Sequence, residues 1–173
     1  MPTRALMILL GLLLGACASV DVPPDRLDGP PADFALAVTV FGPEFDEADI
    51  ADLPRPFRPA RYIVEPNREL RASIGPGSDA ETYPPLTRRL ERRQMAQLWR
   101  LVRDAGLLDP SHPGLIDTTS TFRAPANRRV TTVYAAYGDT RRYLQLYTDR
   151  DDASGAAGIA LADRLAELAW VRE

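Results

Sequence analysis

Two changes of hydrophobic period constrain the fold of this chain more than any other feature of its sequence. Apolar residues alternate with small or polar ones over residues 34–40, which is the period of a strand. Over residues 95–105 they recur at helical spacing, and Gly106 follows where a helix C-terminus favours glycine. The same change recurs later, with strand periods over 130–147 and a helical stripe over 154–171. The sequence therefore predicts strands followed by a helix, twice.

Turn-forming residue pairs divide the strand segments into hairpins. Pro66-Asn67 interrupts the apolar stretch 62–74, and Gly138-Asp139 interrupts 130–147. The predicted order of elements is β-β-β-α-β-β-α. This order indicates an α+β fold with an antiparallel sheet of about four or five strands and two helices on one face.

The first residues have the layout of a secretion signal. Arg4 supplies a positive charge, and an apolar run follows over residues 6–14. A membrane-spanning helix needs about 20 apolar residues, so this run is too short to be one. The run ends in small residues, as the cleavage region of a secretory signal does.

The tetrapeptide Leu14-Gly15-Ala16-Cys17 ends this segment. It resembles the lipobox of bacterial lipoprotein precursors, in which a leucine and two small residues precede an obligatory cysteine. The resemblance covers about a tenth of the chain. It implies that Cys17 carries a thioether-linked diacylglycerol and that the bond between Ala16 and Cys17 is cleaved. The implied partner is a lipid bilayer, held through the acylated Cys17.

The resemblance also implies a location in the cell envelope. An aspartate directly after the cysteine would resemble an inner-membrane retention signal, but this chain has Ala18 there. In an organism with two membranes, an outer-membrane position facing the periplasm is therefore favoured. The following residues are rich in proline and aspartate and lack an apolar period, which is typical of an extended tether. We expect a signal peptide over 1–16, a lipidated Pro-rich tether over 17–32 and a single α+β domain over 33–173.

Charge and rare residues exclude several classes of function. The net charge is −3, whereas a nucleic-acid partner would need a basic face. Cys17 and His112 are the only residues of their types, so neither an internal disulfide nor a His/Cys metal cluster is possible. His112 and its neighbour Ser111 lie in a Pro-rich loop, and adjacency in sequence does not make a catalytic dyad. We expect no cofactor, no metal and no catalytic constellation.

Two groups of side chains are candidates for a binding surface. One is a run of arginines where the first helix is expected to begin, and the other is a pair of tyrosines on one face of the last hairpin. The residues are Arg88, Arg89, Arg92 and Arg93, together with Tyr143 and Tyr147. The arginines are also compatible with a solvated face or with ion pairs to the acidic run 44–52, and the tyrosines with ordinary cross-strand pairing.

The sequence favours a non-enzymatic protein-interaction or assembly module on a membrane anchor, whose partner would be another protein of the cell envelope. One alternative is a cell-wall hydrolase that uses paired carboxylates, for which the acidic run 44–52 is the source. Another is a glycan- or small-ligand-binding module that uses arginine and tyrosine. Two carboxylates converging in a cleft with a raised pKa would favour the hydrolase. An apolar pocket with arginine or tyrosine at its rim would favour ligand binding.

Overall fold

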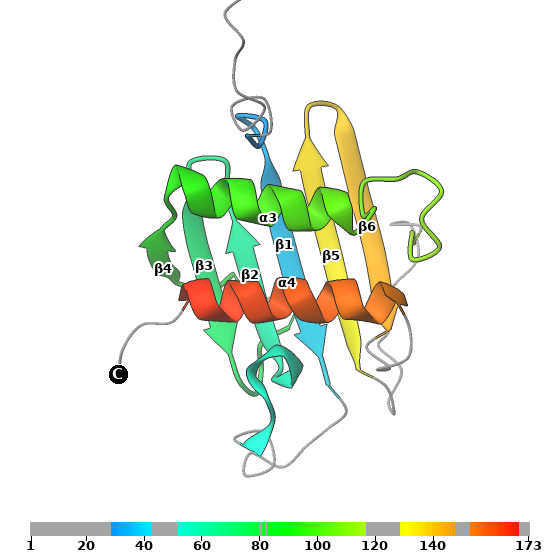
Figure 1. Cartoon of the computed structure of the whole chain (residues 1–173). Coiled ribbons are helices and arrows are strands. Elements are labelled where there is room, and N and C mark those ends of the chain that lie inside the picture. The colour runs from blue at the N-terminus through cyan, green and yellow to red at the C-terminus, as the bar shows by residue number, and fades with distance from the viewer. Residues whose placement is uncertain are drawn as a thin grey trace, which may run out of the picture.

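The computed structural model describes residues 29–42, 52–79, 81, 83–116, 129–147 and 153–169. Over these residues the chain forms one six-stranded sheet and two α-helices (Figure 1). In chain order the elements are β1 (Ala35–Phe41), the 3-10 helix η1 (Arg55–Phe57), β2 (Ala60–Val64), β3 (Glu69–Ile74), β4 (Leu86–Arg89), α3 (Arg92–Asp104), β5 (Val130–Tyr137), β6 (Thr140–Tyr147) and α4 (Ala153–Ala169).

The strands lie in the order β4-β3-β2-β1-β5-β6, and every neighbouring pair is antiparallel. β1 to β4 form a meander that ends at one edge of the sheet. After α3 the chain returns to pair β5 with the other side of β1, so that Val38 faces Tyr62 on one side and Val133 on the other. The α+β class with an antiparallel sheet and two helices is therefore confirmed.

The sheet has six strands where four or five were expected, because β4 was not predicted. Leu86 to Arg89 lack apolar alternation, and three of these four residues are exposed. They form a strand by pairing with β3, with Glu69 opposite Arg89 and Leu70 opposite Arg88. Since an edge strand needs only one paired side, its sequence carries little of the usual strand signal.

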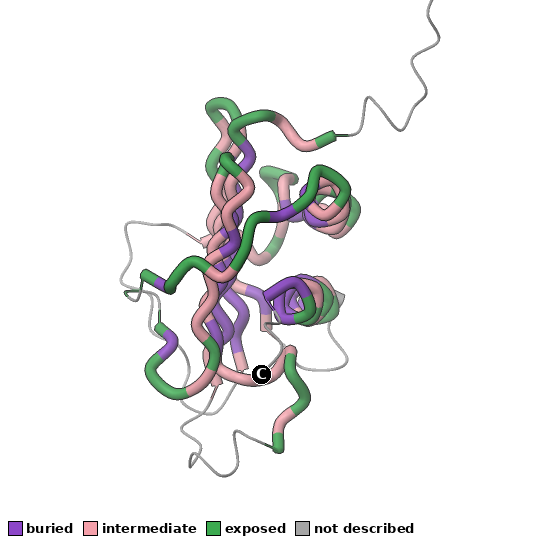
Figure 2. Tube along the Cα trace, turned by 90° about the vertical axis from the view of Figure 1, so that its left-hand side faces the viewer, coloured by how far each residue is buried: buried purple, intermediate pink, exposed green. Residues whose placement is uncertain are grey.

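Both helices lie on the same side of the sheet (Figure 2), as the sequence predicted. The core fills the space between the two layers. Its large, fully buried side chains are Phe34, Leu36, Val38, Tyr62, Leu70, Leu90, Leu98, Leu107, Leu144, Leu146, Leu161 and Leu165. Burial of each such side chain stabilises the fold by about 1.5–3 kcal/mol relative to exposure, so this single layer of contacts holds the sheet and helices together.

The ends of α3 are fixed by local interactions. Glu91 and Gln94 form a capping box, in which each side chain accepts a hydrogen bond from the other residue's backbone amide. Gly106 follows the helix with a φ of +67°, which confirms the predicted stop. α4 begins at Ala153 and ends at Ala169, close to the predicted range 154–171.

Several predicted features lie outside the described residues. They are the motif Leu14–Cys17 with its cleavage residues Ala16 and Cys17, the tether up to residue 28, and residues 44–51 of the acidic run. In the described ranges no helix is long and apolar enough to cross a membrane.

Candidate functional site

A pocket of about 730 Å³ opens where the chain enters the sheet. Three segments surround it: residues 29–32, the turn between β2 and β3, and the first turns of α3. Apolar groups line part of it, from Pro30, Pro31, Pro66, Met95 and Ala96. Four arginines complete the lining: Arg68, Arg92, Arg93 and Arg100. The volume lies within the range of small-molecule sites, which is roughly 300–1,000 Å³.

Residues 29–32 are held against the domain by contacts on their C-terminal side. The carboxylate of Asp33 accepts a hydrogen bond of 2.6 Å from the amide of Gly138, in the β5–β6 turn. The amide of Phe34 donates to the carbonyl oxygen of Pro31 at 3.0 Å. The Phe34 ring is buried and meets Trp99 of α3 edge to face, with centroids 5.1 Å apart. This wall of the pocket is thus anchored to both the sheet and α3.

The second wall is the β2–β3 turn, in which Arg68 has a φ of +73°. It is the one non-glycine residue with positive φ in the described part of the chain. The amide of Arg68 donates to the carbonyl oxygen of Glu65 at 2.8 Å, and the Asn67 side chain accepts from the amide of Glu69 at 3.0 Å. A left-handed conformation costs a side-chain-bearing residue about 1–2 kcal/mol, and turns of this kind normally place glycine there. An arginine therefore occupies this position at a cost in stability.

The third wall is the start of α3. Arg92, Ala96 and Arg100 follow one another at intervals of four residues, so the two guanidinium groups flank a small side chain on one face. Arg92 and Arg93 are exposed in the first turn. Positive charge there opposes the helix dipole, which is unfavourable by about 0.3–1 kcal/mol per charge. Because the capping box already occupies amides of this end, the positive character of the pocket comes from arginine side chains.

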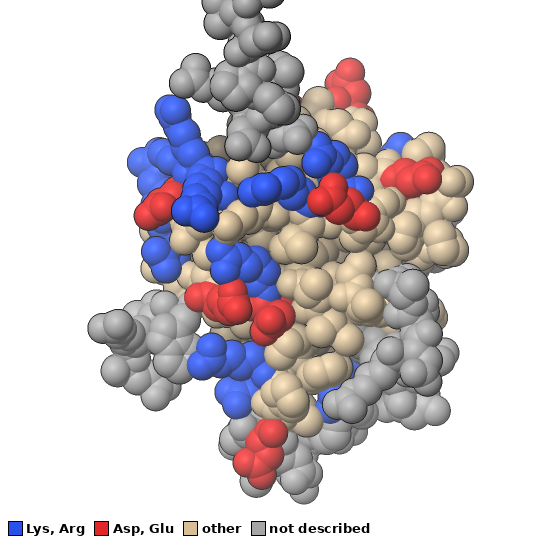
Figure 3. Space-filling model, viewed as in Figure 1, with Lys and Arg blue, Asp and Glu red and all other residues tan. Residues whose placement is uncertain are grey.

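Within the described part of the chain, the ion pairs of the domain leave out the arginines that line the pocket. Among the described residues, Arg68, Arg92 and Arg93 form no ion pair. The basic side chains of this region gather along α3 in the space-filling view (Figure 3). No described carboxylate therefore neutralises Arg68, Arg92 or Arg93.

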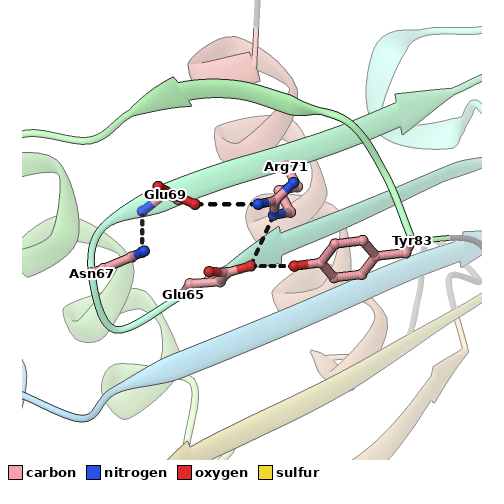
Figure 4. Close-up of polar contacts among 5 residues, drawn as sticks. All are labelled: Glu65, Asn67, Glu69, Arg71 and Tyr83. Carbon is pink, nitrogen blue, oxygen red and sulfur yellow. Dashed lines mark hydrogen bonds and ion pairs between the residues drawn. The ribbon is translucent and has the colours of Figure 1, made fainter.

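The carboxylates at the β2–β3 turn form hydrogen bonds on the face of the sheet away from the helices (Figure 4). Glu65 accepts hydrogen bonds of 2.6 Å from the Tyr83 hydroxyl and 2.8 Å from Arg71, and Arg71 also reaches Glu69 at 3.3 Å. Glu69 and Arg71 flank the buried Leu70, so they point away from the helices. The hydrogen bonds from Tyr83 and Arg71 lower the pKa of Glu65. This network directs the acidic groups of the turn away from the pocket.

The structure separates the six predicted binding residues into three places. Arg92 and Arg93 line the pocket. Arg88 and Arg89 lie on β4 rather than at the start of the helix, and Arg88 donates to the carbonyl oxygen of Leu168 at 3.4 Å. Tyr143 and Tyr147 lie on β6, on the sheet face away from the helices.

On that face, Tyr143 pairs with Tyr134 across the strands, with ring centroids 6.1 Å apart. The Tyr147 hydroxyl accepts a hydrogen bond of 2.7 Å from Gln145. Arg68, Arg100 and residues 29–32 were not identified from the sequence as parts of a site, because only the fold brings the segment before β1, a turn and a helix together. The local signal for Arg68 was its place directly after the Pro66-Asn67 turn.

Ser111 and His112, the neighbouring residues considered for catalysis, form hydrogen bonds within their own loop. The Ser111 hydroxyl donates to Asp109 at 2.7 Å, and the ring nitrogen Nδ1 of His112 accepts from the amide of Gly114 at 3.0 Å. The bonds from Ser111 lower the pKa of Asp109. Across the described ranges the carboxyl groups whose pKa clearly moves are Glu65 and Asp109, and both pKa values fall. No group of three metal-ligating side chains occurs in these ranges.

No family model matches this chain, and no curated protein is similar to it in sequence. The chemistry of the pocket is therefore inferred from its own residues. Guanidinium groups bind phosphate and carboxylate groups through charge-assisted hydrogen bonds, often two at a time. The arrangement suits a ligand with an anionic group beside an apolar part.

Proposed function

We propose that this protein is a lipid-anchored component of the cell envelope whose α+β domain is a non-enzymatic binding module. The binding site is the arginine-lined pocket, and the group it recognises is an anion such as a phosphate or carboxylate. One observation carries the proposal: Arg68, Arg92 and Arg93 surround a pocket of about 730 Å³ without forming ion pairs among the described residues.

The placement of these arginines supports a role in binding rather than in stability. Arg68 lies in a left-handed turn position, and Arg92 and Arg93 lie at the unfavourable end of a helix dipole. Residues that lower stability in this way are typical of functional sites. The apolar lining with arginines at the rim is also the feature that distinguishes ligand binding from the hydrolase alternative.

The lipid anchor is supported by the motif Leu14–Cys17 and by the Pro-rich segment that follows it. Two acyl chains on Cys17 would give stable anchoring, since a single chain binds a membrane only marginally. A domain on such a tether would act at the bilayer surface, at the outer membrane facing the periplasm in an organism with two membranes.

The anchor is tested with the Cys17→Ser variant in cells fed a labelled fatty acid. We expect the variant to lose all lipid labelling and to accumulate as an unprocessed precursor. Labelling equal to that of the parent protein would contradict the anchor.

The pocket is tested by titrating the mature chain, residues 17–173, with inorganic phosphate and following the amide chemical shifts. We expect saturable shifts at Arg68, Ala96 and Arg100 that are lost in R92Q/R93Q. The matched control R141Q/R142Q removes two adjacent arginines from the β5–β6 hairpin and should bind phosphate like the parent chain. Equal losses in the two variants would contradict a specific pocket.

A further inference from the structure

We infer that the anion taken by the pocket is the phosphate of anionic lipid headgroups in the same bilayer that holds the anchor. This inference rests on the proposed function, because it needs both the anchor and the anion site. It adds the chemical class of the ligand and the orientation of the domain on the membrane.

The position of the pocket along the chain is the first support. Residues 29–32 form one of its walls, and they are the residues that join the tether to the sheet. Only residues 18–28 separate them from Cys17. A chain of that length spans roughly 40 Å when extended and roughly 20 Å as a flexible coil. The pocket therefore contains the residues of the domain that are nearest to Cys17 in the sequence.

Charge is the second support. Residues 1–16 contain one charged residue, Arg4, so their removal changes the net charge from −3 to about −4. An anionic surface repels such a domain as a whole, and it also repels residues 18–28, which contain three aspartates and one arginine. Attraction therefore has to come from the four arginines of the pocket. At physiological ionic strength these forces act over roughly 8 Å, so they are felt only when the pocket faces the headgroups.

The mixed lining is the third support. A glycerophospholipid headgroup presents a phosphate directly beside aliphatic carbon. The arginines match the phosphate, since guanidinium forks bind it with paired hydrogen bonds. Pro30, Pro31 and Met95 offer apolar contact beside them. A free phosphate ion would use only the charged half of this lining.

The tether makes a weak site sufficient. A short flexible linker holds a binding module near its target at an effective concentration on the order of millimolar. A pocket with millimolar affinity for a headgroup would then be occupied for much of the time. Docking would need no stronger contact than the pocket arginines, of which Arg92, Arg93 and Arg100 are exposed, can provide.

The experiment uses the mature chain coupled through its single thiol, Cys17, to maleimide lipid in vesicles. One set of vesicles contains phosphatidylcholine alone and a second contains phosphatidylglycerol as well, with dansyl-labelled headgroups in both. Energy transfer from tryptophan to dansyl reports the approach of the domain, since Trp99 lies in α3. We expect strong transfer only with phosphatidylglycerol, and we expect salt to abolish it.

The variants R92Q/R93Q and R141Q/R142Q are compared in the same vesicles and, without coupling, by sedimentation with them. We expect R92Q/R93Q to lower the affinity for phosphatidylglycerol vesicles about 30-fold. We expect R141Q/R142Q to leave this affinity unchanged within about twofold, because its arginines lie outside the pocket. This pattern would support docking through the pocket.

Three results would overturn the inference, and they differ in what they leave standing. If inorganic phosphate binds the pocket but the coupled domain does not approach phosphatidylglycerol, the bilayer is the wrong source and the proposed anion site survives. If both variants weaken docking equally, diffuse charge and not the pocket holds the domain. If neither phosphate nor phosphatidylglycerol binds, both the inference and the proposed function fail.

Discussion

The main-chain amide of Leu90 donates a hydrogen bond of 2.7 Å to the carbonyl oxygen of Arg68. This bond joins the β2–β3 turn to the residue that precedes the capping box of α3. Leu90 is itself fully buried, so the link is anchored in the core. Two of the three walls of the pocket are thereby fixed relative to each other before any ligand arrives. A preformed site of this kind loses little entropy on binding.

The turn residue Arg68 gives a prediction in which stability and binding change in opposite directions. Replacing it with glycine removes the left-handed strain, so R68G should unfold at the same or a higher denaturant concentration, with a gain of up to about 1 kcal/mol. Its affinity for phosphate should fall several-fold. The control R68A keeps the strain and loses the guanidinium, so it should lose the same affinity without gaining stability. A loss of more than about 1 kcal/mol in R68G would contradict this account of the turn.

The first turn of α3 gives a second prediction. R92Q/R93Q removes two positive charges from the positive end of the helix dipole, so urea unfolding should show a gain of about 0.5–1.5 kcal/mol. R141Q/R142Q should change stability less, because these residues lie on a strand. Salt should reduce the difference, since it screens the charges. A loss of stability in R92Q/R93Q would show that these arginines hold the fold.

The contact between α4 and β5 gives a third prediction. A Cβ atom added at Gly158 would lie 3.1 Å from Thr131 Cβ and 3.4 Å from Leu146 Cβ. Overpacking of this kind costs about 1–3 kcal/mol, which exceeds the gain of about 0.8–1 kcal/mol in helix propensity. We therefore expect G158A to destabilise the domain in thermal unfolding. A160G, at an exposed position of the same helix, measures the propensity contribution alone. A more stable G158A would mean that α4 can move away from β5.

Tyr62 gives a prediction for alkaline pH. Burial raises the pKa of its hydroxyl from 10.0 to about 12, so the folded state favours the neutral phenol. This contribution to stability is fully present below pH 10.0 and is lost as the pH rises through about 12. It amounts to roughly 2–3 kcal/mol. Urea unfolding between pH 10 and 12 should therefore depend on pH less steeply in Y62F than in the parent. If the free energy of unfolding depended equally on pH in both proteins, groups other than Tyr62 would govern the loss of stability at alkaline pH.

The elements of this fold that have their own hydrophobic period could be predicted from sequence. Phe34, Leu36 and Val38 alternate because they face the helices, and α3 shows a buried stripe of Met95 and Leu98. β4 has no such period, because it packs against the helical layer only weakly and exists through backbone pairing to β3. Its two arginines were therefore assigned to the start of the helix.

The site could be predicted only in part for a similar reason. Arg92 and Arg93 stood out as adjacent charges in the sequence. Arg68 and Arg100 did not, since each is unremarkable among its neighbours. Their convergence depends on the meander that brings the β2–β3 turn beside α3 and on the entry of residues 29–32 between them. Proximity of this kind is a property of topology, which local patterns do not encode.

The position of β1 between β2 and β5 bears on the order in which the sheet can assemble. Thr39 of β1 pairs with Arg61 of β2 on one side and with Thr132 of β5 on the other. Because β2 follows β1 closely in the sequence and β5 follows only after α3, the ribosome makes one partner strand early and the other late. In a chain that emerges N-terminus first, β1 to β4 can assemble while one edge of β1 has no partner until Val130–Tyr137 appears. An open edge of this kind invites pairing with another molecule. During synthesis, the interval in which this edge of β1 has no partner therefore runs from the completion of β1 to the arrival of β5.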